Sequence, residues 1–221
     1  MKNIVILAAG PPKKNRNRHL EIKSGKTVID IVIDACKSET ENLYAVVDKE
    51  NIDLINHIKN KVSIIHPRDQ KIYSTFEAAL SIVGDTLMVA GDLVNVKSED
   101  IKRFSETKYK SATSLYKYPW AYSNPTSAHP NLIRRSDLGD CMSLIAQEHK
   151  KEFLSNDNQV VCRWLYKQFN PNKPIDEYWY NDIGTYTSFA FFKEIYSNPD
   201  CNSFGEKGTV YFENVVYADN D

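Results

Sequence analysis

Two acidic residues stand where a metal site would need them. Asp92 directly follows the apolar run Thr86–Ala90 and a glycine, and Asp182 precedes Gly184 and Thr185. Carboxylate oxygens at the end of a buried strand are ligands that Mg²⁺ prefers. The alternative is that Asp92 belongs to an ordinary turn and that Asp182 lies in a loop before a helix capped by Thr185. Both interpretations stay open on these residues alone.

A run of basic side chains lies near the N-terminus, after the apolar segment Asn3–Ala9. Six cations and one acid, Glu21, give residues 13–26 a net charge of +5. The cations are Lys13, Lys14, Arg16, Arg18, Lys23 and Lys26. Backbone N–H groups of a loop that leaves a strand, together with Lys and Arg side chains, bind phosphate oxygens. The run is either a polyphosphate cradle or a solvated basic loop, and its place after a buried strand favours the cradle.

The elements that carry these residues alternate between short apolar runs and amphipathic stretches. Aliphatic runs predict strands at Asn3–Ala9, Leu43–Val47, Val62–His66 and Thr86–Ala90. Apolar residues at helical spacing predict helices at Thr27–Lys37 and Glu50–Lys59, and a third helix that starts at the capping-box pattern Ser74–Glu77. This rhythm predicts an α/β fold, with a Rossmann-like, open, mostly parallel sheet and helices on both faces.

The second half of the chain is less regular. Its pattern predicts strands at Ser111–Tyr116, Asn131–Arg135 and Thr209–Ala218, and helices at Ser136–Phe153, Val160–Phe169 and Tyr186–Tyr196. A length of 221 residues suits one domain. We therefore expect a single domain over residues 1–221, with an insertion at about residues 118–176.

Composition excludes several classes of protein. The net charge of -1 argues against a protein that coats nucleic acid or an anionic membrane, since either needs a large positive surplus. No apolar run approaches the length of about 20 residues that spans a bilayer. The four cysteines lie far apart, without metal-ligand spacing, which is typical of a reduced cytoplasmic setting. We expect a cytoplasmic protein that binds neither nucleic acid nor membrane.

The three stretches that could do chemistry recur in this order in one superfamily. They are Leu7-Ala8-Ala9-Gly10, Gly91-Asp92 and Asp182-Ile183-Gly184-Thr185. With them, the chain resembles the nucleotidyltransferases of sugar-phosphate and choline-phosphate type, which have the nucleotide-diphospho-sugar transferase fold. Arg18–Ile22 with Gly25-Lys26 is similar to the segment before the first helix of those enzymes, and Ile72–Thr75 is similar to a stretch near the base.

The resemblance implies a role for each of these stretches. An NTP is joined to a sugar phosphate or another phosphorylated small molecule, and pyrophosphate is released in a Mg²⁺-dependent step. The implied catalytic residues are Arg18, Lys14, Asp92 and Asp182, with Asp92 and Asp182 as the metal ligands. The implied nucleotide-binding residues are Leu7, Ala8, Ala9, Gly10, Lys13, Lys14, Arg16, Tyr73, Ser74 and Thr75. Arg18 would reach the α-phosphate, and the insertion would carry acceptor specificity.

The chain departs from the pattern of the superfamily in its basic loop. The second glycine is replaced by Pro12, which offers no N–H. The usual arginine position holds Lys14, with Arg16 as another candidate, and the usual lysine position holds Arg18. Triphosphate binding must then depend more on side chains than on backbone. The usual E-K-P segment for the acceptor phosphate has no counterpart, and Arg134 and Arg135 are the expected substitutes.

Two other functions are compatible with such a sheet. A glycosyltransferase that uses a nucleotide-sugar would hold its metal with a D-x-D pair, and here Asp92 is followed by Leu93-Val94. A non-catalytic nucleotide or sugar-phosphate binder would account for the altered glycine loop, but not for two retained acids. The sequence leaves the NTP, the acceptor and the oligomeric state open.

Overall fold

A seven-stranded sheet forms the centre of the protein in a computed structural model that describes residues 3–10, 17–94, 96–106, 110–117, 138–155 and 209–211. The strands, in chain order, are β1 (Asn3–Leu7), β4 (Leu43–Val46), β5 (Ser63–Ile65), β6 (Thr86–Ala90), β7 (Ala112–Lys117), β8 (Leu138–Ile145) and β9 (Thr209–Tyr211). Their order across the sheet is β5-β4-β1-β6-β8-β7-β9. Only β8 is antiparallel to its neighbours, which confirms the predicted mostly parallel α/β sheet.

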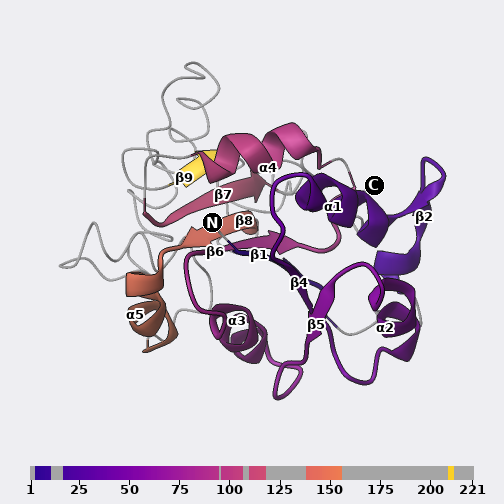
Figure 1. The fold of residues 1–221 in the computed structure, drawn as a ribbon, viewed down its shortest axis with the longest axis horizontal. Helices are drawn as coiled ribbons and strands as arrows, with labels where there is room; N and C mark the ends of the chain where they lie inside the picture. Colours follow the sequence, from indigo (N-terminus) through magenta and orange to yellow (C-terminus); the bar gives the residue numbers. More distant parts are fainter. Residues whose placement is uncertain are drawn as a thin grey trace, which may run out of the picture.

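Helices cover both faces of the sheet (Figure 1). They are α1 (Val28–Lys37), α2 (Ile52–Ile58), α3 (Ile72–Leu80), α4 (Ser98–Ser105) and α5 (Lys150–Ser155), with short 3₁₀ turns η1 (Arg18–Leu20) and η4 (Gln147–His149). In Figure 1, α1 and α4 lie on one side of the strands and α3 and α5 on the other. None of the described helices has the length and apolar character needed to cross a bilayer.

Alternating side chains of the strands divide the core into two layers. Ile4 and Ile6 of β1 pack with apolar residues of α1, α2 and α4, whereas Val5 faces Phe76 of α3 and Phe153 of α5. The rings of Phe76 and Phe153 meet edge to face, with their centroids 5.6 Å apart. Because β1 is buried on both faces, its sequence is a continuous aliphatic run, as a parallel central strand requires.

Polar contacts fasten α1 to α2 on one face. Thr27 caps α1 by accepting a hydrogen bond from the backbone N–H of Asp30 (3.2 Å). The Asp30 carboxylate also pairs with Lys61 (2.6 Å) and lies 2.9 Å from Nε2 of His57. Partial burial acts to raise the pKa of Asp30, but hydrogen bonds from Lys61, Thr27 and His57 outweigh it and lower that pKa. Asp30 is therefore held as an anion between the two helices.

The predicted helix Ser136–Phe153 is wrong for most of its length. Residues 138–145 form β8, which pairs with β6 from Thr86↔Ile145 to Val89↔Met142 and with β7 on its other edge. Met142 and Leu144 face one core layer and Ile145 the other, so a two-residue alternation decides the structure here. Helical structure begins only with the 3₁₀ turn η4 at Gln147, and the α-helix α5 begins at Lys150.

The predicted capping box at Ser74–Glu77 is also wrong. α3 begins two residues earlier, at Ile72, and Lys71 at its N-cap makes no side-chain cap. Asp69 supplies the acceptor, because its Oδ1 receives hydrogen bonds from Ser74 Oγ (2.6 Å) and from the backbone N–H of Lys71 (2.9 Å). The bond from Ser74, followed by that from Lys71, lowers the pKa of Asp69.

Some elements were not anticipated, and others cannot be compared. The hairpin of β2 (Ile22–Lys23) and β3 (Lys26–Thr27) turns at Ser24 and Gly25, which both have positive φ. Neither this hairpin nor α4 was predicted. The segments predicted at Asn131–Arg135, Val160–Phe169 and Tyr186–Tyr196 lie outside the described residues. Of the range proposed as an insertion, 118–176, the structure describes residues 138–155, which hold β8, η4 and α5. The insertion therefore stays a prediction.

Candidate active site at the carboxyl ends of β1 and β6

The ends of β1 and β6 meet at a close backbone approach. The N–H of Gly91 donates to the carbonyl of Leu7 (2.9 Å), and the N–H of Ala8 donates to the carbonyl of Val46 in β4 (2.9 Å). A Cβ on Gly91 would lie 2.9 Å from the Leu7 oxygen and 3.0 Å from the Ala8 Cβ. Glycine is therefore required at position 91, and it brings the next residue, Asp92, beside the loop that follows β1.

Asp92 forms an ion pair with Arg18 at this position. Nε of Arg18 lies 2.9 Å from Oδ2 of Asp92, and the two side chains are 21% and 9% exposed. Such a pair is attractive because little water screens it, although burying both charges carries a desolvation cost. The structure thus joins one cation of the basic run to the acid that follows β6.

Gly10 lies under the guanidinium of Arg18. A Cβ on Gly10 would be 2.8 Å from Nη2 of Arg18, closer than a carbon atom and a nitrogen atom can approach. The missing side chain therefore gives the guanidinium its space. Gly10, Arg18 and Asp92 together form a three-residue cluster, called the Arg18 cluster below.

Two asparagines hold the segment from which Arg18 extends. Asn17 precedes η1, and its carbonyl accepts a hydrogen bond from the N–H of Leu20 (2.9 Å). Nδ2 of Asn17 donates to Oδ1 of Asn51 (2.9 Å), in the loop that follows β4. Sequence reasoning missed both residues, although an asparagine directly before a helical pattern is a signal for an N-cap at Asn51.

The Arg18 cluster has the groups for handling a phosphate and a metal ion. A guanidinium binds phosphate oxygens with two parallel hydrogen bonds, and a carboxylate at a strand end suits Mg²⁺, which is commonly held by one or two carboxylates together with substrate phosphates. Within the described ranges, no group of three or more His, Cys, Asp or Glu side chains forms a metal site made of protein alone.

Comparison with solved structures identifies the architecture that carries this cluster. No protein-family model and no curated protein matches the sequence. The inositol-1-phosphate CTP transferase from T. maritima aligns at 15% identity, covering 71% of this chain and 75% of that chain, with a TM-score of 0.50. The 4-diphosphocytidyl-2C-methyl-D-erythritol synthase from Anaerococcus prevotii aligns at 14% identity, covering 77% and 83%, with a TM-score of 0.52. The chain has the nucleotide-diphospho-sugar transferase fold.

Within this nucleotide-diphospho-sugar transferase fold, the first predicted nucleotide segment lies at the end of β1. Leu7 is the last residue of the strand, and Ala8 and Ala9 are buried in the two core layers. Gly10 alone of the four contacts a charged group of the candidate site, through Arg18. The structure therefore brings together Gly10, Arg18 and Asp92 from the predicted set.

The second predicted segment lies in the first turns of α3. The hydroxyl of Tyr73 donates to the carbonyl of Leu154 (2.9 Å), at the end of α5, and the buried Ser74 bonds Asp69. Thr75 Oγ1 lies 3.5 Å from the carbonyl of Lys71 within the same helix. These bonds fix α3 to its surroundings, so the predicted contact of Tyr73, Ser74 and Thr75 with a base stays a prediction.

Six other predicted site residues lie outside the described residues. They are Lys13, Lys14, Arg16, Arg134, Arg135 and Asp182. Their assignments to phosphates, acceptor and metal stay predictions.

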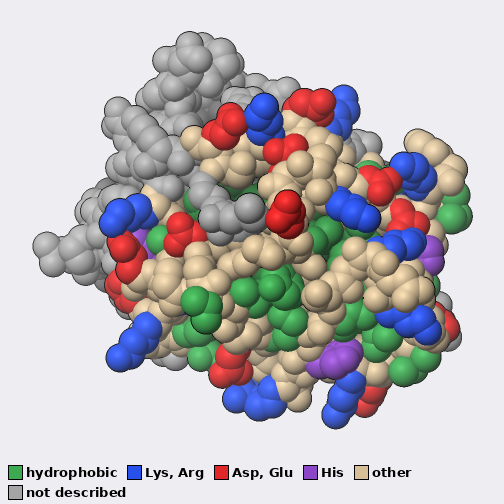
Figure 2. Space-filling model, in the orientation of Figure 1, with side chains coloured by type: hydrophobic (Ala, Val, Ile, Leu, Met, Phe, Trp, Pro, Cys, Tyr) green, Lys and Arg blue, Asp and Glu red, His purple; other side chains and the backbone are tan. Residues whose placement is uncertain are grey.

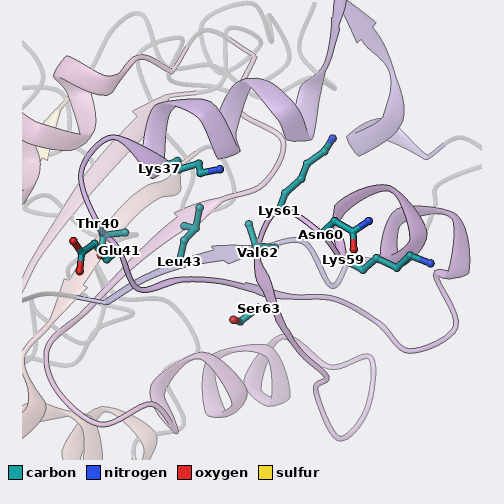
Figure 3. Close-up of a pocket in the computed structure, with 9 residues that line it drawn as sticks. All are labelled: Lys37, Thr40, Glu41, Leu43, Lys59, Asn60, Lys61, Val62 and Ser63. Atoms are coloured by element: carbon teal, nitrogen blue, oxygen red, sulfur yellow. The ribbon is translucent and has the colours of Figure 1, made fainter.

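A separate hollow of about 600 Å³ opens at the amino ends of the strands, opposite the carboxyl ends where the Arg18 cluster lies. It lies before β4 and β5, where Leu43 and Ser63 begin the strands. Figure 3 shows the side chains of Lys59 and Lys61 pointing away from Leu43, and Lys61 is already paired with Asp30. The hollow lies at the amino ends of these strands and is therefore remote from the Arg18 cluster.

Charge on the visible face gives no sign of a polyanion-binding surface. Figure 2 shows acidic and basic side chains interspersed around the described part of this face, without a continuous basic patch. This mixture of charges agrees with the near-neutral net charge of the chain.

Proposed function

We propose that the protein is a nucleotidyltransferase, which joins an NTP to a sugar phosphate or another phosphorylated small molecule and releases pyrophosphate. The observation that carries the proposal is the Arg18 cluster, because it places a phosphate-binding cation and a metal-binding acid together. It lies at the carboxyl ends of two parallel strands, the edge at which open α/β sheets bind ligands. The fold shared with two proteins named as a CTP transferase and a diphosphocytidyl synthase supports the same class.

The reaction follows from the charges that must be managed. An oxygen of the acceptor phosphate attacks the α-phosphorus of the NTP, a new P–O bond forms, and the bond to the β-phosphate breaks with its electron pair leaving on pyrophosphate. The attacking oxygen is already anionic, so no general base is required. Positioning and charge neutralisation then supply most of the rate enhancement.

Arg18 is the group that both Asp92 and a nucleotide phosphate would attract. In this structure its Nε faces Asp92, and an α-phosphate would compete for the same guanidinium. Transfer of Arg18 to the phosphate leaves the Asp92 carboxylate available. Asp92, with Asp182, would hold Mg²⁺, which when bound neutralises phosphate charge and orients the leaving group.

No observation on the described residues favours the alternative function, a glycosyltransferase that uses a nucleotide-sugar. A D-x-D pair would need a second carboxylate two residues after Asp92, where the structure has the buried Val94. Leu93, between them, is fully buried in one core layer.

Pyrophosphate release tests the proposed function. The protein is incubated with Mg²⁺, each NTP in turn and a panel of phosphorylated acceptors. We expect release that depends on one NTP and one acceptor, and we expect Asp92→Asn to abolish it. Glu41→Gln is the matched control, since it removes an exposed acid at the opposite edge of the sheet and should leave the rate unchanged.

Three results would contradict the proposal. Full pyrophosphate release by Asp92→Asn would remove Asp92 from the site. Release of a nucleoside diphosphate from a nucleotide-sugar would assign the protein to glycosyl transfer. Binding of a nucleotide without turnover of any acceptor in the panel would favour a non-catalytic binder.

A further inference from the structure

Asn51 connects three segments of the chain through one side-chain oxygen. Its Oδ1 accepts a hydrogen bond from the N–H of Leu54 (3.3 Å), which caps α2, and another from Nδ2 of Asn17 (2.9 Å). Asn51 is only 8% exposed, and its bond to Asn17 is partly buried. Partial burial strengthens such a hydrogen bond relative to one in open water.

The Asn17 end of this junction leads directly to the Arg18 cluster. Asn17 precedes Arg18, and the carbonyl of Asn17 receives the N–H of Leu20, so the junction fixes the start of η1. Arg18 then reaches across to Asp92, at the end of β6. The segment of residues 17–20 is therefore held by Asn51 on one side and by Asp92 on the other.

These two attachments differ in what happens when an anion binds. The ion pair of Arg18 with Asp92 is open to competition when a phosphate binds, because the phosphate attracts the same guanidinium. The bond from Asn17 to Asn51 involves no group that the phosphate would take. It can persist through binding and keep the base of the Arg18 side chain in place.

We infer that Asn51 is a positioning residue for nucleotide binding, which acts through Asn17 to hold the segment that carries Arg18. This inference rests on the proposed function. Asn51 touches neither the substrate nor the reacting atoms in this account. Asn51 keeps the backbone of residues 17–20 in place while the Arg18 side chain turns from Asp92 towards a phosphate.

Capping of α2 alone does not explain the residue. A short side-chain oxygen, such as that of serine, caps a helix about as well as asparagine does. The Nδ2 of Asn51 is buried and has no hydrogen-bond partner among the described residues, which is unfavourable. What asparagine adds over serine is the reach that brings its oxygen to Asn17.

Two variants separate the junction from the cap. Asn51→Ser keeps an oxygen for the N–H of Leu54 but is too short to reach Asn17. Asn17→Ala removes the donor and leaves the cap of α2 intact. Asn56→Ser is the matched control, because Asn56 is an exposed asparagine of the same helix.

The first measurement is hydrogen exchange of the backbone amides of Leu20 and Glu21, which are bonded to Asn17 and Arg18. We expect faster exchange at both amides in Asn51→Ser and Asn17→Ala, and exchange as in the wild type for Asn56→Ser. This readout needs no substrate. It therefore tests the junction even if the wild type releases no pyrophosphate, a result that would sink the proposed function instead.

The second measurement is the steady-state kinetics of pyrophosphate release. We expect the KM for the NTP to rise about threefold to tenfold in each single variant, the effect of one ordinary hydrogen bond, while kcat changes less than twofold. The double variant should be no worse than either single variant, since both remove the same bond. Asn51→Asp keeps an acceptor for Asn17 and should exchange at Leu20 and Glu21 as the wild type does.

Three outcomes would overturn the inference. One is unchanged exchange and unchanged KM in Asn51→Ser. Another is an effect of Asn51→Ser that Asn17→Ala does not reproduce, which would place the role in α2. The third is full additivity of the two substitutions, which would show that the residues act separately.

Discussion

At the scale of single residues, Arg18 and Asp92 are paired with each other, so each competes with any ligand that the other would bind. The guanidinium covers a carboxylate that would otherwise attract a cation, and both groups are largely removed from water. Loss of one partner from such a pair leaves an uncompensated charge, which typically costs about 3–5 kcal/mol. If Asp92 holds a metal ion, as we propose, the pair would link stability to metal binding.

Arg18→Gln tests this link. We expect the variant to have a lower Tm than the wild type, because Asp92 is left without its cation, and we expect saturating Mn²⁺ to restore much of the loss in the absence of nucleotide. The wild type should gain little from Mn²⁺ alone. The measurement is thermal unfolding with and without the metal ion. A double variant with Asp92→Asn is the control, and an equal response of that double variant to Mn²⁺ would show that the ion binds elsewhere.

Gly10 and Gly91 make a contrasting pair of glycines in the same site. A Cβ on Gly91 would collide with the backbone oxygen of Leu7, which cannot move without disturbing β1. A Cβ on Gly10 would meet only the end of the Arg18 side chain, which can rotate away. Gly91 is therefore needed for folding, and Gly10 is needed for the placement of Arg18.

Alanine at each position should separate these roles. We expect Gly91→Ala to reduce the free energy of unfolding by about 1–3 kcal/mol, as overpacking does, and Gly10→Ala to change it by less than about 0.5 kcal/mol. Gly10→Ala should nevertheless raise the KM for the NTP. Denaturant unfolding and pyrophosphate release are the two measurements. A large loss of stability in Gly10→Ala would contradict the assignment.

At this scale, the sequence predicted the positions of Gly10 and Asp92 at strand ends better than it predicted the contacts that they make. Asp92 follows an apolar run and a glycine, and Gly10 ends another, so both could be located from pattern. The pairing of Arg18 with Asp92 could not be predicted, because 74 positions separate them and only the adjacency of β1 and β6 brings them together. The Asn17–Asn51 bond depends in the same way on β4 lying beside β1.

At the scale of elements, Asp30 shows how one side chain joins two helices. It lies in the first turn of α1 and pairs with His57, which is in α2, and with Lys61, which follows α2 in the chain. Its lowered pKa means that the folded state favours the carboxylate more than the unfolded state does. Asp30 then stabilises the fold above the ordinary pKa of 3.8, and this contribution is lost as the pH falls through the folded pKa.

The substitution Asp30→Asn tests whether this contribution to stability depends on pH. We expect a loss of about 0.5–1 kcal/mol at pH 7, the range of a partly exposed ion pair. The difference in Tm between the variant and the wild type should shrink as the pH falls below about 4. Asp34→Asn, which removes the exposed pair with Lys26, is the control and should change stability less. A difference that stays constant down to acid pH would rule out the charge as its source.

Elements with a strong single pattern were predicted well, and ambiguous ones were not. The predicted strand Thr86–Ala90 is confirmed to the residue as β6, and α1 begins one residue after its predicted start. β8 was predicted as part of a helix, and its residues Leu138–Ile145 carry only a weak strand pattern, because they include glycine and aspartate, which are depleted in strands. Its strand character comes from the two neighbours that it bonds, which a local pattern does not report.

At the scale of the whole molecule, β8 unites the two halves of the chain. It lies between β6, which belongs to the parallel first half, and β7, which belongs to the second. Leu144 is 1% exposed and packs in the same core layer as Leu87 and Val89 of β6. The described halves should therefore unfold together.

The substitution Leu144→Ala tests whether β8 joins the two halves into one unfolding unit. We expect the free energy of unfolding to fall by about 2–5 kcal/mol, the usual cost of truncating a buried leucine, with a single transition in denaturant. Val83→Ala is the control, because Val83 is 87% exposed and should contribute almost nothing. A loss below about 0.5 kcal/mol, or a second transition, would show that β8 is not a central strand.

The place of β8 also has a consequence for how the protein is made. A ribosome releases the chain from its N-terminus, so β1, β4, β5 and β6 are available long before residues 138–145. During that interval, the outer edge of β6 presents unpaired N–H and C=O groups beside an apolar surface. Such an edge is a template for pairing with other nascent chains. The synthesis of this protein therefore includes a period of aggregation risk that ends only when β8 closes the sheet.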